Sequence, residues 1–273
     1  MRKIKNSIGE YYDKYSVQYI TSMKTNKISR FYRQTNVREL QKALNIALSE
    51  CGSNGNNLSV LEIGCGPCID LYYLLRKNKE VIQRIDFTGV DLSSKFIQEC
   101  RKNFGNFNFI VSDAIEFLSN SNRTWHFIIT SFGVINHFNP EELSDFFKVV
   151  SSKLETGGLI FISFLNRFAL NEWIYFLFTG KLKSMFRRLQ NTHVGFDNEL
   201  VNQYYYSLRY IKKTLKETGY SVLWSSGAGI FVPPPYVNVK KRTFNTLVLV
   251  ENFIRPFFYV LSDLSIVVVR KEK

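Results

Sequence analysis

The sequence predicts an α/β fold, a doubly wound, seven-stranded, mostly parallel sheet with helices on both faces and a helical cap insertion. Two observations predict it. Five short runs of mostly apolar, β-branched and aromatic residues are bounded by turn residues, as in strands that are buried on both faces. Segments with apolar residues at helical spacing lie between these runs, and that alternation is typical of βαβ units in a parallel sheet.

The five apolar runs are the expected first strands, and helical patterns separate them. We expect these strands at residues 59–64, 87–92, 107–111, 127–132 and 159–165. Helices are expected at residues 69–76, 94–104 and 141–154. The last of these has Pro140 at its start and two glycines, Gly157 and Gly158, after its end, which are common helix boundary signals.

The alternation breaks after residue 165. Residues 166–206 combine an aromatic-rich helical pattern with a basic, polar stretch, and we expect them to form a cap insertion after the fifth strand. A helix with Ser207 as N-cap follows and ends at Gly219.

The C-terminal part of the chain carries the expected last two strands, at residues 220–232 and 265–270. Between them, residues 233–262 form a second insertion, which opens with three prolines and continues as an amphipathic aromatic helix over 243–261. The interpretation is a single domain over residues 1–273, with lid helices in residues 1–50.

Composition and targeting signals favour a folded cytoplasmic chain. Apolar residues make up 45% of the sequence, enough for a sizeable core. The basic N-terminus has no apolar run behind it, so no signal peptide is expected, and no apolar stretch approaches the ~18 residues of a membrane span. Four cysteines without a secretion signal suggest a reducing compartment. The single CxxC pair, Cys65 and Cys68, is weak evidence for zinc, and no metal site is expected.

The net charge is +13, from 36 Lys and Arg against 23 Asp and Glu. The basic residues are spread along the chain, which favours ordinary surface charge for most of them. Local clusters leave attraction to an anionic partner open, namely a phosphorylated substrate, a nucleic acid or a membrane face. The clusters are Lys181, Lys183, Arg187 and Arg188, and Lys240, Lys241 and Arg242.

A glycine turn after the first strand is the strongest local signal for a ligand site. Gly64 permits a tight turn, Gly66 permits close approach of a ligand to the backbone, and the next helix offers free N–H groups at its start. The third glycine of a dinucleotide turn is missing, and Glu62 precedes the turn. That acid disfavours a pyrophosphate, and hence a nicotinamide cofactor, but suits an ammonium group.

Two further acids end the next two strands. Asp91 follows the second strand and suits a bidentate grip on ribose hydroxyls, and Asp113 follows the third. The carboxyl ends of parallel strands line one crevice in an open sheet, so we expect Glu62, Asp91 and Asp113 to face the same ligand. The alternative for each acid is a helix cap or a surface charge.

These motifs together resemble class I S-adenosylmethionine-dependent methyltransferases, which have a Rossmann-like fold. The resemblance covers residues 10–165 well and rests on the segment from Glu62 to Gly66, on the acids at 91 and 113, and on the turn before residue 159. It implies S-adenosylmethionine as cofactor and S-adenosylhomocysteine as product. The residues that it assigns to the cofactor are Tyr19, Glu62, Gly64, Cys65, Gly66, Asp91, Leu92, Asp113, Ala114, Phe132 and Gly133.

The acceptor side is less determined by the sequence. His137 follows the fourth strand and is the first candidate base, with a loop-ordering role as the equal alternative, and Asn136 is a candidate for orienting an acceptor. The family's insertion after the fifth strand covers the acceptor, where arginines suit an anionic group and aromatic residues a hydrophobic one. The candidates there are Arg167, Trp173, Arg187, His193 and Tyr205.

The sequence therefore predicts a methyltransferase that acts on the oxygen or nitrogen of a small molecule in a biosynthetic pathway. The alternatives are a nucleic-acid methyltransferase, which the charge favours and the missing nucleic-acid module disfavours, and a methyltransferase-like protein that only binds. Peripheral contact with an anionic membrane is a further hypothesis, from the basic aromatic stretches at residues 168–190 and 241–260.

Overall fold

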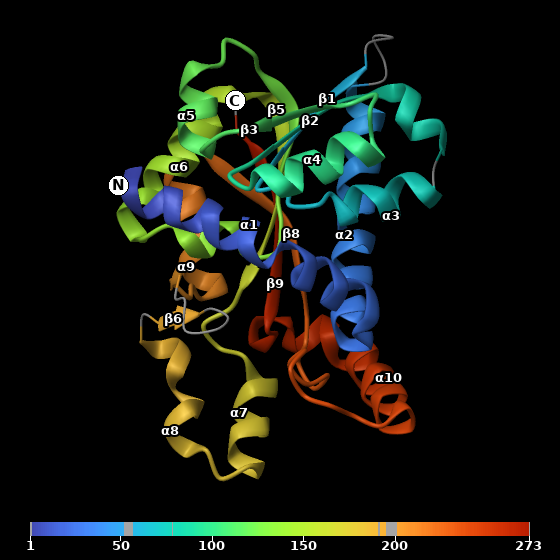
Figure 1. The fold of residues 1–273 in the computed structure, drawn as a ribbon, viewed down its shortest axis with the longest axis vertical. Coiled ribbons are helices and arrows are strands. Elements are labelled where there is room, and N and C mark those ends of the chain that lie inside the picture. The colour runs from blue at the N-terminus through green and yellow to red at the C-terminus, as the bar shows by residue number, and fades with distance from the viewer. Residues whose placement is uncertain (1, 52–56, 78, 191, 195–200, 273) are drawn as a thin grey trace.

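The computed structural model describes residues 2–51, 57–77, 79–190, 192–194 and 201–272 (Figure 1). Its centre is a seven-stranded sheet in the order β3-β2-β1-β4-β5-β9-β8. All neighbouring strands are parallel except β9, which is antiparallel to both β5 and β8. The predicted sheet is confirmed. Its strands are β1 (Leu58–Ile63), β2 (Ile85–Asp91), β3 (Asn108–Val111), β4 (Trp125–Thr130), β5 (Leu154–Leu165), β8 (Tyr220–Ala228) and β9 (Leu264–Lys271).

Helices cover both faces of the sheet, as the alternation of side chains along the buried strands requires. Val60 and Leu61 of β1 point to opposite faces and join two different hydrophobic clusters. Figure 1 shows one group of helices on each side. The first group is α2 (Lys27–Cys51), α3 (Ile69–Lys77) and α4 (Ser94–Asn103), and the second is α5 (Ala114–Asn120), α6 (Pro140–Lys153) and α9 (Leu208–Glu217).

Three predicted elements differ from the structure by three residues or more at one end. The strand expected to reach residue 232 ends at Ala228, because the Glu251 carboxylate accepts the N–H groups of residues 229–232 that would otherwise join the sheet. β5 begins at Leu154 instead of residue 159, with a register shift against β4. The late helix begins two residues early, at Lys241, and ends at Phe258.

The N-terminal helix α1 (Arg2–Thr25) packs against the start of α4 and closes over the carboxyl ends of the strands. Gly9 allows this approach, since a Cβ there would lie 2.9 Å from the carbonyl oxygen of Leu92. Asp13 accepts hydrogen bonds from the hydroxyls of Ser93 (2.6 Å) and Ser94 (2.9 Å) and from the N–H of Lys95 (3.0 Å). A carboxylate from α1 therefore caps α4 and fixes the two helices together.

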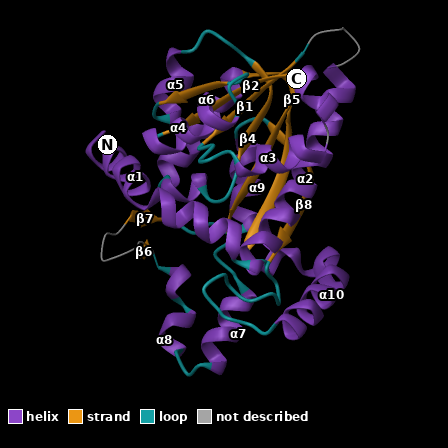
Figure 2. Cartoon of the chain, turned by 45° about the vertical axis from the view of Figure 1, so that its right-hand side comes forward, coloured by secondary structure: helices purple, strands orange, loops and turns teal. Residues whose placement is uncertain are grey.

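Residues 166–206 and 229–261 add elements at one end of the molecule, which both ribbon views show below the sheet (Figure 1, Figure 2). They are α7 (Leu170–Phe178), α8 (Leu182–Met185), the short hairpin of β6 (Thr192–Val194) and β7 (Val201–Gln203), and α10 (Lys241–Phe258). Among the described residues, no helix has the length and apolar character needed to cross a membrane.

Candidate active site

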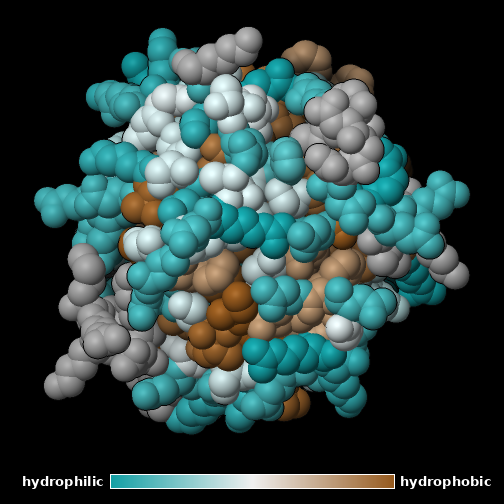
Figure 3. Space-filling model, turned by 90° about the horizontal axis from the view of Figure 1, so that it is seen from above, coloured by the Kyte–Doolittle hydropathy of each residue, from teal (hydrophilic) through white to brown (hydrophobic). Residues whose placement is uncertain are grey.

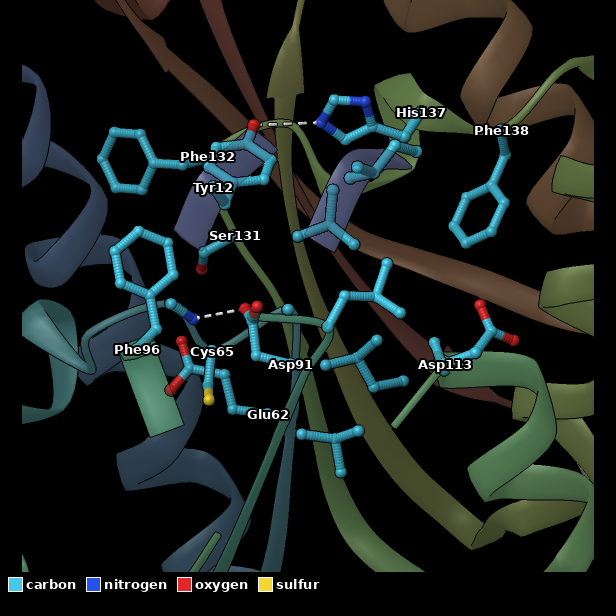
Figure 4. Close-up of a pocket in the computed structure, with 18 of the residues that line it drawn as sticks. Tyr12, Glu62, Cys65, Asp91, Phe96, Asp113, Ser131, Phe132, His137 and Phe138 are labelled. Carbon is cyan, nitrogen blue, oxygen red and sulfur yellow. Dashed lines mark hydrogen bonds between the residues drawn. The ribbon is translucent and has the colours of Figure 1, made fainter. Parts of the chain in front are cut away.

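A pocket lies at the carboxyl ends of β1, β2, β3 and β4, beside α1 (Figure 4). It brings together residues that the sequence placed in the N-terminal lid helices and at the ends of separate strands, which are Tyr19, Glu62, Gly64, Cys65, Gly66, Asp91, Leu92, Asp113, Ala114, Phe132 and His137. Two predicted residues, Gly133 and Asn136, do not line it.

The glycine turn forms one wall of the pocket. Gly64 has a φ of +64° and packs so closely that a Cβ would lie 2.3 Å from a methyl carbon of Val134, so no side chain fits there. Gly66 has a φ of +51°, and a Cβ on it would meet no atom within 4 Å. The space beside Gly66 therefore belongs to the pocket, and the backbone there is open to a ligand.

Two carboxylates of different character face this wall. The Asp91 carboxylate accepts hydrogen bonds from the N–H groups of Gly66 and Ser93, both at 2.8 Å. Burial nevertheless raises the pKa of Asp91 to about 6. Glu62 is buried at the end of β1, and no hydrogen bond to its carboxylate occurs within the described part of the chain. Burial, followed by the nearby charge of Asp70, raises the pKa of Glu62 well above its usual value.

An arginine that the sequence did not suggest completes this end of the pocket. Arg33 of α2 is buried, forms an ion pair with Asp70, and lies with its guanidinium 4.4 Å from the centre of the Phe132 ring. Asn36 donates to the second oxygen of Asp70 at 2.7 Å. The Nε of Arg33 has no hydrogen-bond partner in the described part of the chain. Arg33 is thus held in place by Asp70 and keeps a donor available beside Glu62.

At the other side of the pocket, Tyr12 and His137 form a hydrogen-bonded pair, 3.2 Å from the hydroxyl oxygen to Nε2 (Figure 4). The Nδ1 of His137 lies 3.3 Å from the carbonyl oxygen of Asn202. A carbonyl only accepts, so Nδ1 carries the proton, Nε2 is the acceptor, and the tyrosine hydroxyl donates. Burial lowers the pKa of His137, which keeps the imidazole neutral near pH 7, and burial raises the pKa of Tyr12.

Asp113 and the turn after β4 shape the remaining walls. One oxygen of Asp113 accepts the N–H groups of Ile115 and Glu116, both at 3.1 Å, so this acid caps α5. Asp113 is therefore a helix cap, the alternative role that the sequence left open, and it also lines the pocket. Phe132 has a φ of +53°, unusual for a side chain of this size, and Ser163 holds the strained turn by accepting from the N–H of Phe132 at 2.9 Å.

Asn136 is not available to an acceptor. Its side chain is fully buried, and its amide donates to the carbonyls of Leu165 (3.0 Å) and Tyr204 (2.6 Å) while accepting from the N–H of Leu165 (2.8 Å). Gly133 lies behind it, with a φ of +89°. Both residues fix the loop that carries His137, which corrects the expectation that they meet ligand directly.

Four of the acceptor residues expected in the cap insertion, Arg167, Trp173, Arg187 and Tyr205, lie outside this pocket. Arg187 pairs with the carboxylate of Glu172, and Arg167 donates to the carbonyl of Leu189 at 3.0 Å. Trp173 packs edge-on against Phe168, and Tyr205 is buried under the guanidinium of Arg188. The side chain of His193 lies outside the described residues. Of the two arginines expected to contact a substrate, Arg187 therefore pairs with a buried acid and Arg167 with a backbone carbonyl.

The CxxC pair gains a third member in the structure. The thiol sulfurs of Cys65, Cys68 and Cys100 all lie within 4.8 Å of one another, and all three residues are buried. The thiol of Cys100 on α4 donates to the carbonyl of Gly66 at 3.1 Å. Sequence spacing alone does not reveal this cluster, because Cys100 comes 32 residues after Cys68 and only the packing of α4 brings it close.

The comparisons with known proteins agree with this geometry. Residues 60–158, which include the glycine turn and all three acidic strand ends, match a family model described as a methyltransferase domain. No curated protein matches the chain. Among solved structures, a magnesium protoporphyrin IX methyltransferase from Synechocystis PCC 6803 with bound SAH has a TM-score of 0.59 at 14% identity, over 97% of this chain and 98% of that one.

Two further structures are similar over nearly the whole chain. A SAM-dependent methyltransferase from Archaeoglobus fulgidus has a TM-score of 0.54 at 18% identity, over 93% of this chain and 99% of that one. The plantazolicin methyltransferase, in complex with SAH and a triazolic desmethylPZN analog, has a TM-score of 0.55 at 18% identity, over 100% and 98%. These likenesses confirm the predicted fold.

Proposed function

We propose that this chain, a class I S-adenosylmethionine-dependent methyltransferase, transfers the methyl group to the oxygen or nitrogen of a small-molecule acceptor. The observation that carries the proposal is the Tyr12–His137 pair, which faces the same pocket as Glu62 and Asp91 (Figure 4). When bound, the cofactor supplies a methyl group on a sulfonium and a neutral thioether as leaving group.

The residues of the pocket fit this cofactor. Three of its polar groups have no hydrogen-bond partner within the described residues, namely the carboxylate of Glu62, the Nε of Arg33 and the hydroxyl of Ser131. Buried polar groups are normally hydrogen-bonded, so a pocket with three open ones favours a polar ligand. A ligand with both an amino group and a carboxylate offers a partner to the acid and to the arginine.

The binding roles follow from the position of each group. Glu62 would hold the amino group and Arg33 the carboxylate of the methionine part, with Gly64 and Gly66 leaving the backbone accessible between them. Asp91 keeps lone pairs for the ribose hydroxyls beyond its bonds to Gly66 and Ser93. Asp113, Ala114 and Leu92 would surround the adenine. All of these residues line one pocket, which supports their acting on one ligand.

Tyr12 and His137 provide a route for the proton of an acceptor hydroxyl. The acceptor would donate to the oxygen of Tyr12, and Tyr12 would pass its own proton to Nε2 of His137. His137 then becomes an imidazolium, whose Nδ1–H is already bonded to the carbonyl of Asn202. The lowered pKa of His137 leaves it neutral and able to accept the proton near pH 7. An amine acceptor that is already neutral needs no such step.

A small acceptor suits the site because the pocket lies beneath α1 and between the strand ends. The named substrates of two structural neighbours, magnesium protoporphyrin IX and a plantazolicin precursor analogue, are also discrete small molecules. At 14% and 18% identity, the likeness to these two structures supports the fold of this chain and does not identify its acceptor. The nucleic-acid alternative predicts a strongly salt-dependent affinity for RNA or DNA, which binding measurements at two salt concentrations test directly.

The first experiment is calorimetric titration with S-adenosylhomocysteine. We expect micromolar binding by the wild type and at least ~100-fold weaker binding by Asp91→Ala, since each hydrogen bond lost to a charged group costs about 1.5–3 kcal/mol. If the folded wild type did not bind S-adenosylhomocysteine, the proposed cofactor site would be contradicted. A methyltransferase-like protein without methyltransferase activity would then be the favoured hypothesis.

Variants of the proton route then separate chemistry from binding. With a hydroxyl acceptor found by screening, Tyr12→Phe and His137→Gln should lower kcat by roughly 10²–10⁴-fold, the usual contribution of general base catalysis, while SAH affinity stays unchanged. The matched control is His126→Gln, since His126 lies at the opposite end of β4 and pairs with Ser59. Equal losses in kcat for the control and for His137→Gln would contradict the proposed route.

A further inference from the structure

Exposed apolar side chains are concentrated at the end of the molecule that carries α7, α8 and α10. Among the described residues, fourteen of the twenty exposed large hydrophobic side chains lie in residues 168–189 and 231–260. The most exposed of these are Phe178 (83%), Phe253 (79%), Phe257 (73%) and Leu249 (71%). Soluble surfaces rarely gather apolar side chains in this way without a partner.

The outward face of α10 is itself apolar. Leu249, Phe253 and Phe257 follow one another at intervals of four residues, which places them on one exposed stripe of the helix. The opposite face packs inward, where Phe244, Leu247 and Val248 contact the cluster around Phe31 and Tyr32. The core therefore uses one face of α10, and the second apolar face has no partner within the described chain.

The charges at this end are one-sided. In the two fully described ranges 166–190 and 229–263, the acidic residues are Glu172, Glu251 and Asp263, and all three are buried and hydrogen-bonded within the protein. The basic residues of the same ranges include six exposed side chains, Arg167, Lys181, Lys183, Lys240, Lys241 and Arg242. Three of these stand at the start of α10, where positive charge opposes the helix dipole and so does not stabilise the helix.

We propose that this surface, the basic apolar end made by residues 167–189 and 240–260, binds an anionic lipid bilayer. Exposed phenylalanines and leucines enter the boundary between headgroups and acyl chains, and the lysines and Arg242 contact anionic headgroups. A second copy of the chain is the less suitable occupant, because a two-fold interface would bring the same positive surfaces together. The other end of the molecule, seen from above in Figure 3, shows a largely hydrophilic surface with an apolar area near its centre.

Co-flotation with vesicles of phosphatidylcholine, with and without phosphatidylglycerol, tests the proposal. We expect the wild type to float with the anionic vesicles and to dissociate as salt rises. Replacing Lys240, Lys241 and Arg242 together by Gln should weaken binding on the order of a hundredfold, since each basic residue near an anionic surface contributes roughly a factor of five. Phe253→Ser with Phe257→Ser should also lose binding.

Matched variants elsewhere on the surface control for general effects. Lys148→Gln with Lys213→Gln removes two exposed lysines from α6 and α9, and Val17→Ser removes an exposed apolar residue of α1. These should bind vesicles as the wild type does. SAH binding by every variant shows that it is folded. Two results would overturn the proposal, namely no flotation with anionic vesicles at low salt, or a dimer in sedimentation that Phe253→Ser with Phe257→Ser dissociates.

A different observation carries a second proposal, which concerns the thiol cluster. The sulfurs of Cys65, Cys68 and Cys100 already lie within 4.8 Å of one another, and three sulfurs at ~2.3 Å from a shared ion would be about 4 Å apart. Cys68 has a φ of +52°, an unfavourable backbone for a non-glycine residue, and this conformation belongs to the loop that brings it to the other two. Gly89 leaves room for the Cys65 sulfur, because a Cβ there would lie 3.1 Å from it.

We infer that these three thiols form a binding site for a soft, thiophilic metal ion of the Cu⁺ class. Thiolates select such ions, and the cluster contains three sulfurs and no further His, Asp or Glu ligand among the described residues, whereas structural zinc takes four protein ligands. Binding releases the thiol protons to solvent and ties the glycine loop to α4. The inference does not rest on the proposed reaction, although Cys65 belongs both to the thiol cluster and to the lining of the pocket.

Titration of the reduced, metal-free protein with Cu⁺ against a competing chelator tests the site, with Cd²⁺ as a probe through its thiolate charge-transfer absorbance. We expect one ion per chain for the wild type and for Cys51→Ser, the variant of the remaining cysteine. Cys68→Ser and Cys100→Ser should each lose the ion while remaining folded by circular dichroism. Equal metal retention by the wild type and by Cys68→Ser with Cys100→Ser would overturn the inference.

Discussion

Two groups of buried charges in this molecule differ in how completely they are satisfied. At the pocket, neither the carboxylate of Glu62 nor the Nε of Arg33 has a hydrogen-bond partner among the residues that the structure describes. In the cap insertion, Glu172 accepts from Arg187, Arg188 (2.9 Å) and Tyr236 (3.2 Å), and Arg188 also donates to Asp263 at 2.6 Å. The first group leaves room for a ligand, and the second leaves none.

The difference teaches how to separate binding charges from structural ones. Burial raises the pKa of Glu62, and no cation of the protein overcomes that effect. Burial acts in the same direction on Glu172, but the charges of Arg188 and Arg187 outweigh it and hold the pKa of Glu172 below its usual value. A buried carboxylate without a neighbouring positive charge that offsets its burial is a candidate to bind a cationic ligand. A buried carboxylate paired with arginines stabilises the fold instead.

The largest expected effect comes from breaking the structural group. Arg188→Ala removes the buried partner of both Glu172 and Asp263, and the free energy of unfolding should fall by about 3–5 kcal/mol because two acids lose their buried cation. Urea denaturation measures it. Arg187→Ala is the control, since that side chain is 35% exposed and shares only Glu172, and its cost should be about 1 kcal/mol. Equal costs would contradict the distinction.

The opposite pattern is expected at the pocket. Glu62→Gln should weaken SAH binding by roughly a hundredfold, as one charged hydrogen bond of about 2–3 kcal/mol is lost, while the unliganded protein keeps or gains stability. Calorimetry and thermal unfolding of the same samples give both values. Glu116→Gln, an exposed residue of α5, should leave both unchanged. A large loss of stability in Glu62→Gln with intact SAH affinity would place Glu62 in the structural group.

Asp91 sharpens the comparison through pH. Its pKa is raised to about 6 in the folded chain, so its contribution to stability is present below the unfolded value near 4 and is lost as pH rises through 6. Between pH 4 and pH 7, the wild type should therefore lose about 2 kcal/mol of unfolding free energy relative to Asp91→Asn, which does not ionise. One unit of pKa shift corresponds to about 1.36 kcal/mol. A difference independent of pH would show that Asp91 is compensated.

The smallest expected effect concerns the cap that α1 places on α4. Asp13→Asn should lower SAH affinity roughly fivefold, the effect of a lost helix cap, because α1 closes the pocket less firmly. Burial raises the pKa of Asp13, but hydrogen bonds from Ser93, Lys95 and Ser94 outweigh it, so the cap is present at neutral pH and is lost only as pH falls through the lowered pKa. Unchanged affinity, measured by calorimetry at pH 7, would contradict this role.

Much of the lining of the pocket was predictable because its signals are local in the chain. Gly64 and Gly66 are required by a turn that immediately follows a strand, and Asp91 and Asp113 end strands whose apolar runs are visible in the sequence. Parallel strands bring their carboxyl ends to one edge whatever the side chains are. Arg33 has no comparable signal, since it sits in a long helix with other basic residues, and only the packing of α2 against Asp70 brings it to the pocket.

The acceptor side was predicted less well for the converse reason. Arg167, Trp173, Arg187 and Tyr205 have the chemistry of a substrate site, but side-chain chemistry alone does not say whether a buried partner already occupies it. Asn136 was expected to meet an acceptor, and instead its amide is taken by three backbone groups. The identity of a partner depends on contacts between distant segments, which spacing does not encode.

The sequence by itself determined the sheet, the glycine turn and the acids at the strand ends, because periodicity, turn geometry and strand order follow from residues close together in the chain. Only the tertiary structure decided which charges meet each other. It brought Tyr12 to His137 across 125 residues, Cys100 to Cys65 and Cys68, and Arg188 to Asp263. The physical reason is that a polar group is either satisfied or open according to what packs against it, and packing joins residues that the sequence keeps apart.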